Sequence, residues 1–83
     1  MAVTRVHLWG ALRPAAGGAE FVDIDSATIR ELLRKLEEQY PLMHPFIEQG
    51  ISVAIDGTVY QDDWGKAIPE DAEVYLLPRI EGG

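Results

Sequence analysis

The stretch that decides the fold, residues 28–40, reads Thr-Ile-Arg-Glu-Leu-Leu-Arg-Lys-Leu-Glu-Glu-Gln-Tyr. Thr28 and Glu31 fit a capping box, in which the threonine side chain caps the first helical turn and the glutamate reaches back. Apolar residues then recur at intervals of three and four, which is the pattern of an amphipathic helix. We therefore expect a helix with one buried face that ends at Pro41. Its apolar residues are Ile29, Leu32, Leu33, Leu36 and Tyr40.

Five short segments with the composition of strands flank this helix, two before it and three after it. The sequence Asp56-Gly57 is a strong tight-turn signal between the third and the fourth. If the first and last strands lie side by side at the centre, they run parallel, while the hairpin pairs run antiparallel. We expect an α+β fold, a β-grasp (ubiquitin-like) mixed sheet of four to five strands with one main helix packed on one face. The expected strands cover residues 3–9, 20–24, 51–55, 58–60 and 73–77.

Two longer connections carry turn residues. Residues 10–18 contain three glycines and a proline, so they predict a loose hairpin loop. Residues 41–50 predict a connection with one helical turn, and we expect its apolar residues to tuck beneath the sheet. His44 has no second candidate ligand near it, so we interpret it as a surface or capping residue and not as a metal ligand. The apolar residues of the second connection are Leu42, Phe46 and Ile47.

Length and composition narrow the classes of function. The chain of 83 residues allows one domain with one core, so we interpret residues 1–83 as a single domain. Its net charge of -7 argues against nucleic acid. The charge favours either a protein partner with a basic docking surface or simple solubility. The lack of cysteine excludes disulfides, thiolate metal sites and cysteine nucleophiles.

Features that the sequence lacks lead to two expectations, one about localisation and one about catalysis. No apolar run is long enough to span a bilayer and no signal peptide is recognisable, so we expect a cytoplasmic protein with no membrane partner. No pair of residues resembles a general acid and base with a pocket, so we do not expect an enzyme.

The last residues look like a group that the fold presents to a partner. Pro78 breaks the hydrogen-bond ladder of the last strand. We expect residues 79–83 to form a flexible tail that ends in a free carboxylate on Gly83. Gly82 and Gly83 have no side chains, so a partner can close tightly around the backbone and reach that carboxylate. The competing interpretation is a frayed terminus without a function.

Strand alternation predicts a second surface. If Val6, Val53 and Leu76 face the helix, the alternate residues, Ala54 among them, face outward. An apolar, aromatic-bearing sheet face near the tail is typical of a docking site for a partner protein. The alternative is that a loop or a second copy of the chain covers it. The expected docking residues are His7, Trp9, Phe21, Tyr75 and Leu77.

In their order along the chain, these features resemble the MoaD/ThiS family of β-grasp sulfur carriers. The matching features are the opening strand, the capped helix, residues 53–57, residues 68–74 and the ending Leu-Leu-Pro-Arg-Ile-Glu-Gly-Gly over residues 76–83. The resemblance covers essentially the whole chain, and the ending is its most specific part.

The resemblance implies a reaction at the C-terminus. A ubiquitin-activating-type adenylating enzyme would use ATP to convert the Gly83 carboxylate to an acyl-adenylate, and a sulfur donor would then replace AMP to give a thiocarboxylate. A sulfur-acceptor enzyme, such as a molybdopterin synthase large subunit, would receive the sulfur. The chain itself would be a protein co-substrate that binds no cofactor. Arg79, Ile80 and Glu81 would line the channel of the recipient enzyme.

The resemblance favours molybdenum cofactor biosynthesis as the pathway. Arg79 and Glu81 depart from the proline and small residue found in many molybdopterin synthase small subunits. Carriers for thiamine, cysteine, thiolated tRNA or secondary metabolites therefore remain as alternatives. Two other classes stay open, a ubiquitin-like modifier joined to lysines and a β-grasp binding module that uses only its sheet face.

Overall fold

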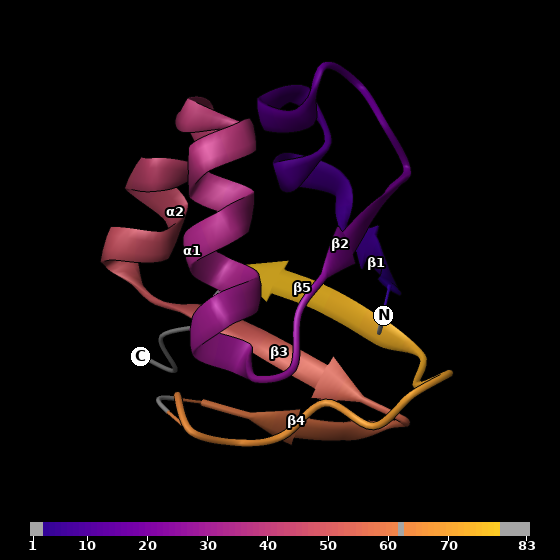
Figure 1. The fold of residues 1–83 in the computed structure, drawn as a ribbon. Coiled ribbons are helices and arrows are strands. Elements are labelled where there is room, and N and C mark those ends of the chain that lie inside the picture. The colour runs from indigo at the N-terminus through magenta and orange to yellow at the C-terminus, as the bar shows by residue number, and fades with distance from the viewer. Residues whose placement is uncertain (1–2, 62, 79–83) are drawn as a thin grey trace.

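The computed structural model describes residues 3–61 and 63–78. In this part of the chain, five strands form one mixed sheet with the order β2-β1-β5-β3-β4 (Figure 1). The central neighbours β1 and β5 run parallel, and the other neighbouring pairs run antiparallel. The predicted mixed β-grasp sheet is therefore confirmed. The strands are β1 (Val3–Leu8), β2 (Phe21–Asp25), β3 (Ile51–Ile55), β4 (Thr58–Tyr60) and β5 (Val74–Pro78).

Helix α1 (Ile29–Gln39) begins as the capping residues predict. The Thr28 side chain accepts a hydrogen bond from the Glu31 amide at 3.2 Å. The Glu31 carboxylate accepts one from the amide of Ala27 at 2.9 Å, one residue earlier than in a standard capping box. The apolar stripe packs into the core, with only Tyr40 half-buried. The buried residues of the stripe are Ile29, Leu32, Leu33 and Leu36.

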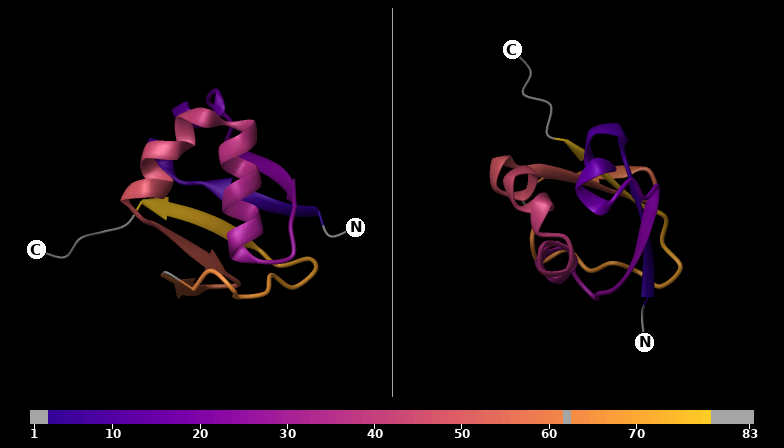
Figure 2. Two further views of the ribbon diagram at one scale, coloured as in Figure 1. Left: turned by 60° about the vertical axis from the view of Figure 1, so that its left-hand side comes forward. Right: turned by 90° about the horizontal axis from the view of Figure 1, so that it is seen from above.

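The helices lie on one side of the sheet. The 3₁₀ turn η3 (Pro41–Met43) leads into the short helix α2 (His44–Gln49), which stands beside α1 (Figures 1 and 2). Within the described residues, no helix covers the opposite face (Figure 2). On that face, the side chains of Phe21, Val59 and Tyr75 are exposed.

The connection between β1 and β2 differs from the loose loop that the sequence predicts. It forms two 3₁₀ turns, η1 (Gly10–Leu12) and η2 (Pro14–Ala16), and the Leu12 side chain is fully buried in the core. The Arg13 guanidinium anchors the turns by donating a hydrogen bond to the Leu8 carbonyl at 3.1 Å. The glycines of this segment permit the return to the sheet, since Gly17 and Gly18 both adopt positive φ angles. The expectation of a loose loop was wrong because it ignored an apolar side chain that the core requires.

The second connection also differs in detail. Leu42, expected beneath the sheet, is 68% exposed, and Met43 is fully buried in its place. Consecutive side chains of a 3₁₀ turn point about a third of a turn apart, so only one of the two can enter the core. Phe46 and Ile47 pack against the core as expected, although both remain partly exposed.

Candidate functional site

The open face of the sheet carries a row of side chains drawn from all five strands. The register pairs Phe21 with His7 and His7 with Tyr75. It continues from Tyr75 to Ala54 and from Ala54 to Val59. Directly paired residues point to the same side of a sheet and lie next to each other, so the row is continuous.

Aromatic rings form the centre of this row. The rings of His7 and Tyr75 stack with their centroids 4.6 Å apart and their planes 20° apart. The Phe21 ring lies 6.2 Å from His7 on the other side. The guanidinium of Arg5 lies 4.2 Å above the Phe21 ring and pairs with Asp23 at 3.3 Å. These contacts hold the rings in place, so a partner would meet a preorganised surface.

Exposed apolar area is concentrated on this face. Of the six large apolar side chains exposed in the described residues, only Leu42 lies away from it. Contiguous exposed apolar surface on a small protein is typical of an interaction site. We call this surface the docking face. Its exposed apolar residues are Val3, Trp9, Phe21, Val59 and Tyr75.

The docking face reaches the point where β5 ends. The amide of Trp9 donates a hydrogen bond to the Leu76 carbonyl at 3.2 Å, so Trp9 lies beside the last residues of β5. On the other side, Leu77 pairs with Ser52, whose hydroxyl accepts a hydrogen bond from the Gln61 side chain at 3.1 Å. A partner on the docking face would therefore also contact the end of the strand at Pro78.

Carboxylates lie at the opposite end of β5. The Tyr75 hydroxyl donates a hydrogen bond to the Glu73 carboxylate at 2.7 Å, and this bond raises the pKa of Tyr75. Asp56 accepts a hydrogen bond from the Glu73 amide at 2.9 Å. Both carboxylates are exposed, as is Asp23 on β2. This acidic rim suits a partner whose docking surface is basic.

A comparison of the sequence with models of protein families identifies the family of this chain. A family model described as the ThiS family matches residues 6–83, which begins within β1 and includes the two terminal glycines. The chain belongs to the ThiS family. This is the family of ubiquitin-like sulfur carriers that the sequence resembles, and its small carriers are generally non-catalytic. A search of curated protein sequences finds no significant match.

Solved structures show how closely the fold follows its relatives. SAMP1 from Haloferax volcanii has a TM-score of 0.74 at 22% identity, with 98% of this chain and 99% of that chain covered. CysO from Mycobacterium tuberculosis has a TM-score of 0.76 at 18% identity, with 93% and 99% covered. A putative molybdopterin converting factor subunit 1 from Pyrococcus furiosus has a TM-score of 0.75 at 17% identity, with 96% and 100% covered. At these identities the likeness shows that the ThiS-family chain shares their fold.

The structure places the five expected docking residues of this ThiS-family chain on one face. His7, Phe21 and Tyr75 form the aromatic centre, and Trp9 and Leu77 lie nearer the end of β5. His7 and Leu77 are half-buried and the other three are exposed. The expected tail residues Arg79, Ile80, Glu81, Gly82 and Gly83 lie outside the described residues.

Val3 and Val59 belong to the docking face but were not among the residues expected there. Ala54 was expected there and is less exposed than its outward position suggests. Val3 follows the same alternation as His7, and Val59 pairs directly with Ala54 across the hairpin. The two-residue turn at Asp56-Gly57 fixes that pairing, so the signal for Val59 was present. Ala54 faces outward but is only 8% exposed, and the larger residues Tyr75 and Val59 are paired with it on the two neighbouring strands.

The described residues of the ThiS-family chain were also searched for metal sites and for membrane-spanning helices. Among residues 3–61 and 63–78, no group of three or more histidine or carboxylate side chains is arranged to hold a metal ion. The same residues include no helix with the length and apolar character needed to cross a bilayer.

Proposed function

We propose that this protein is a sulfur carrier, in which the carboxylate of Gly83 is activated and converted to a thiocarboxylate that donates sulfur in a biosynthetic pathway. The observation that carries the proposal is the family match, which extends to Gly83. Residues 6–83, glycine doublet included, therefore match a family of sulfur carriers. Gly82 and Gly83 are the reactive end, and no catalytic residue is assigned to the chain itself.

The proposed chemistry explains why an activating enzyme is needed. A carboxylate is a poor acyl donor, because its oxygen is a poor leaving group. A carboxylate oxygen of Gly83 attacks the α-phosphorus of ATP on the adenylating enzyme, and pyrophosphate leaves. With sulfide as the donor, the sulfur forms a bond to the Gly83 carbonyl carbon as the bond to the AMP oxygen breaks, which gives the thiocarboxylate directly. With a persulfide as the donor, the same attack gives an acyl disulfide, and a thiol then releases the thiocarboxylate by forming a disulfide with the other sulfur of the donor. The thiocarboxylate carries the sulfur to an acceptor enzyme.

The docking face and the tail act together in this proposal. Hot spots of protein interfaces are enriched in aromatic residues, which the row of Phe21, His7 and Tyr75 supplies. The face continues to Leu77 and the end of β5, so an enzyme bound there is close to the start of the tail. Arg79, Ile80 and Glu81 would line the channel that leads to the active site of the enzyme.

Molybdopterin synthesis is the first candidate pathway. Its support is the shared fold with a protein described as a putative molybdopterin converting factor subunit 1. The chain also shares its fold, with a TM-score of 0.77, with a structure described as the BexX/CysO complex of Amycolatopsis orientalis. A carrier for thiamine, cysteine, thiolated tRNA or a secondary metabolite therefore stays as the alternative within the same chemistry.

A second candidate function is protein modification. Two structures of similar fold and 22% identity are described as small archaeal modifier protein 1. A modifier would share the adenylation step but would join Gly83 to a lysine of another protein. Adducts linked through lysine would distinguish it from a carrier that only accumulates the thiocarboxylate.

Adenylation tests the function that both candidates share. With a cognate activating enzyme and ATP, the intact chain should stimulate exchange of pyrophosphate into ATP, and a variant that lacks Gly82 and Gly83 should not. Equal exchange with the truncated variant would show that the glycine doublet is not the activated group, which would contradict both candidates.

A further inference from the structure

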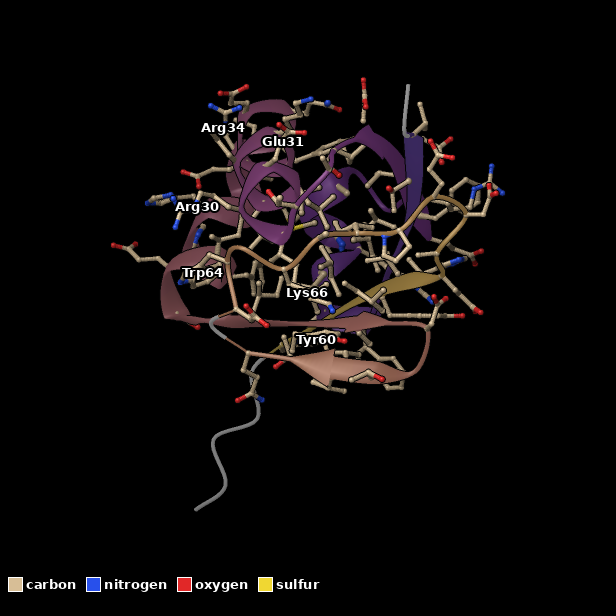
Figure 3. All side chains as sticks on the ribbon, turned by 60° about the horizontal axis from the view of Figure 1, so that its bottom comes forward. Arg30, Glu31, Arg34, Tyr60, Trp64 and Lys66 are labelled. Carbon is tan, nitrogen blue, oxygen red and sulfur yellow. The ribbon has the colours of Figure 1, made fainter. Side chains whose placement is uncertain are left out.

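A second charged surface lies on the helix side of the sheet. The loop after β4 runs alongside the first turn of α1, where Ile29 donates a hydrogen bond to the Lys66 carbonyl at 3.0 Å. Arg30 donates one to the Trp64 carbonyl at 2.9 Å. An antiparallel bridge between Thr28 and Ala67 continues the pairing. These backbone contacts bring Arg30, Trp64 and Lys66 into one neighbourhood (Figure 3).

Positive charge is concentrated here on a chain with a net charge of -7. We define the cationic surface as Arg30, Arg34, Lys66 and the neighbouring rings of Tyr60 and Trp64 (Figure 3). Lys66 lies 5.1 Å from the centre of the Tyr60 ring, so the ring orients its ammonium group. A hollow of about 240 Å³ lies at the first turns of α1, beside both arginines.

The three cations of this surface are not neutralised by described carboxylates. Among residues 3–61 and 63–78, no ion pair within 4.0 Å involves Arg30, Arg34 or Lys66. Glu31 also lines the hollow, but its carboxylate is engaged by the Ala27 amide at 2.9 Å and by Lys35 at 3.8 Å. By contrast, Arg5 is paired with Asp23. The cationic surface thus carries three positive charges that are not held in an ion pair with a described residue.

The spacing of the cations favours an extended acidic segment over a small anion. Arg30 and Arg34 are four residues apart on α1, which places their Cβ atoms about 5–6 Å apart. Alternate residues of an extended chain are about 6.6 Å apart on one side, a similar interval. Two carboxylates of a Glu-X-Glu segment would therefore match the two guanidiniums.

The cationic surface and the docking face are on opposite sides of the sheet. Tyr60 pairs with Val53, whose side chain is in the core beneath α1, whereas the neighbouring Val59 belongs to the docking face. A partner on the docking face therefore leaves the cationic surface exposed. The two surfaces allow two partners to bind at once.

We propose that the cationic surface binds an acidic, extended segment of a partner protein, independently of the docking face. The segment supplies carboxylates to Arg30, Arg34 and Lys66, and an apolar side chain of the segment packs beside Trp64. This inference does not depend on sulfur transfer, since it rests on charge and geometry on the helix side alone.

The test uses the full chain, isotope-labelled for amide NMR, and the peptide acetyl-Glu-Ser-Glu-Leu-Glu-amide. We expect shift changes confined to residues 28–35 and 63–67, with amides of β1 and β5 unmoved. The double substitution Arg30→Gln with Arg34→Gln should weaken binding roughly tenfold, because two exposed charge pairs are lost. The matched control is Gln39→Glu with Gln49→Glu, which makes the same change in net charge at exposed positions of α1 and α2. It should bind within about twofold of the unchanged chain, because both guanidiniums remain in place and charges added at exposed positions have small effects.

Several outcomes would overturn the proposal. One is equal binding of a peptide in which glutamine replaces every glutamate, and another is unchanged binding by the double arginine variant. Inorganic phosphate that produces the same shifts at the same concentration would show a site for small anions instead. Self-association that the arginine substitutions abolish would show that the occupant is a second copy of the chain. Unchanged peptide binding by Leu77→Asp would support independence from the docking face, and its loss would contradict it.

Discussion

At the scale of single residues, His44 has no candidate metal-ligand residue near it in the sequence, but the fold places it between two carboxylates. Its Nδ1 atom contacts the Glu37 carboxylate of α1, and its Nε2 atom lies 3.3 Å from Glu48 of α2. The hydrogen bond and charge of Glu37 raise the pKa of His44, and Glu48 adds to the effect. The protonated imidazole thus joins the two helices.

This arrangement predicts a pH-dependent stability. A raised folded-state pKa means that the stabilisation is fully present below the unfolded value of 6.5 and is lost as pH rises through the folded value. The unchanged chain should therefore be more stable than His44→Gln at about pH 6 and equally stable at about pH 9. The difference should be small, because the pair is exposed. Urea unfolding of both proteins at the two pH values measures it, and an advantage that grows with pH would contradict the assignment.

The sequence could predict that His44 is a surface residue and not a metal ligand, since no second ligand is near it in the chain. It could not predict the pairing with Glu37, seven residues earlier. That contact requires the turn η3 to fold α2 back against α1.

At the scale of elements, the turns between β1 and β2 are part of the core. Leu12 in η1 is fully buried, whereas Leu42 in η3 is 68% exposed. Leu12→Ala should therefore reduce the free energy of unfolding by about 2–5 kcal/mol, because it leaves a cavity in packed surroundings. Leu42→Ala makes the same chemical change at a surface and should alter it by less than about 0.5 kcal/mol. If urea unfolding shows that Leu12→Ala and Leu42→Ala change the free energy of unfolding equally, residues 10–16 are not packed into the core.

The regular elements were predictable and the connections were not. The helix of residues 28–40 follows from local signals, namely the Thr28 cap, the apolar stripe and Pro41. Whether Leu12 and Met43 are buried depends on side chains that are distant in the sequence and leave space for them in the core. Glycines and prolines nearby indicate where the chain turns, but they do not indicate whether the turn is buried.

At the scale of the whole molecule, the docking face should be needed for activation of the tail. Leu77→Asp should abolish thiocarboxylate formation while the fold, followed by circular dichroism, remains, because a charge would be buried in the contact with the activating enzyme. Val59→Asp, at a more exposed position, should weaken the reaction as a second test. Leu42→Asp carries the same charge on a surface away from this face and should react normally. Normal thiolation of both face variants would show that the activating enzyme binds elsewhere.

The sequence predicted which residues share the open face of the sheet, because strand alternation assigns faces without knowledge of the register. It did not predict the cationic surface. Arg30 and Arg34 look like the ordinary polar side of a helix, and the backbone pairing of Thr28 with Ala67 brings the segment of Lys66 alongside the start of that helix. A surface that follows from the alternation of side chains along strands can be predicted from the sequence. A surface assembled from segments that are distant in the sequence can be recognised only in the folded structure.

The most direct test of the central claim is the intact mass of the full chain after incubation with a cognate activating enzyme, ATP and a sulfide source. The account predicts a mass increase equal to the replacement of one oxygen by sulfur, located at Gly83 by fragmentation and absent when Gly83 is deleted. An unchanged mass, while a known carrier of the same enzyme is thiolated in a parallel reaction, would contradict it.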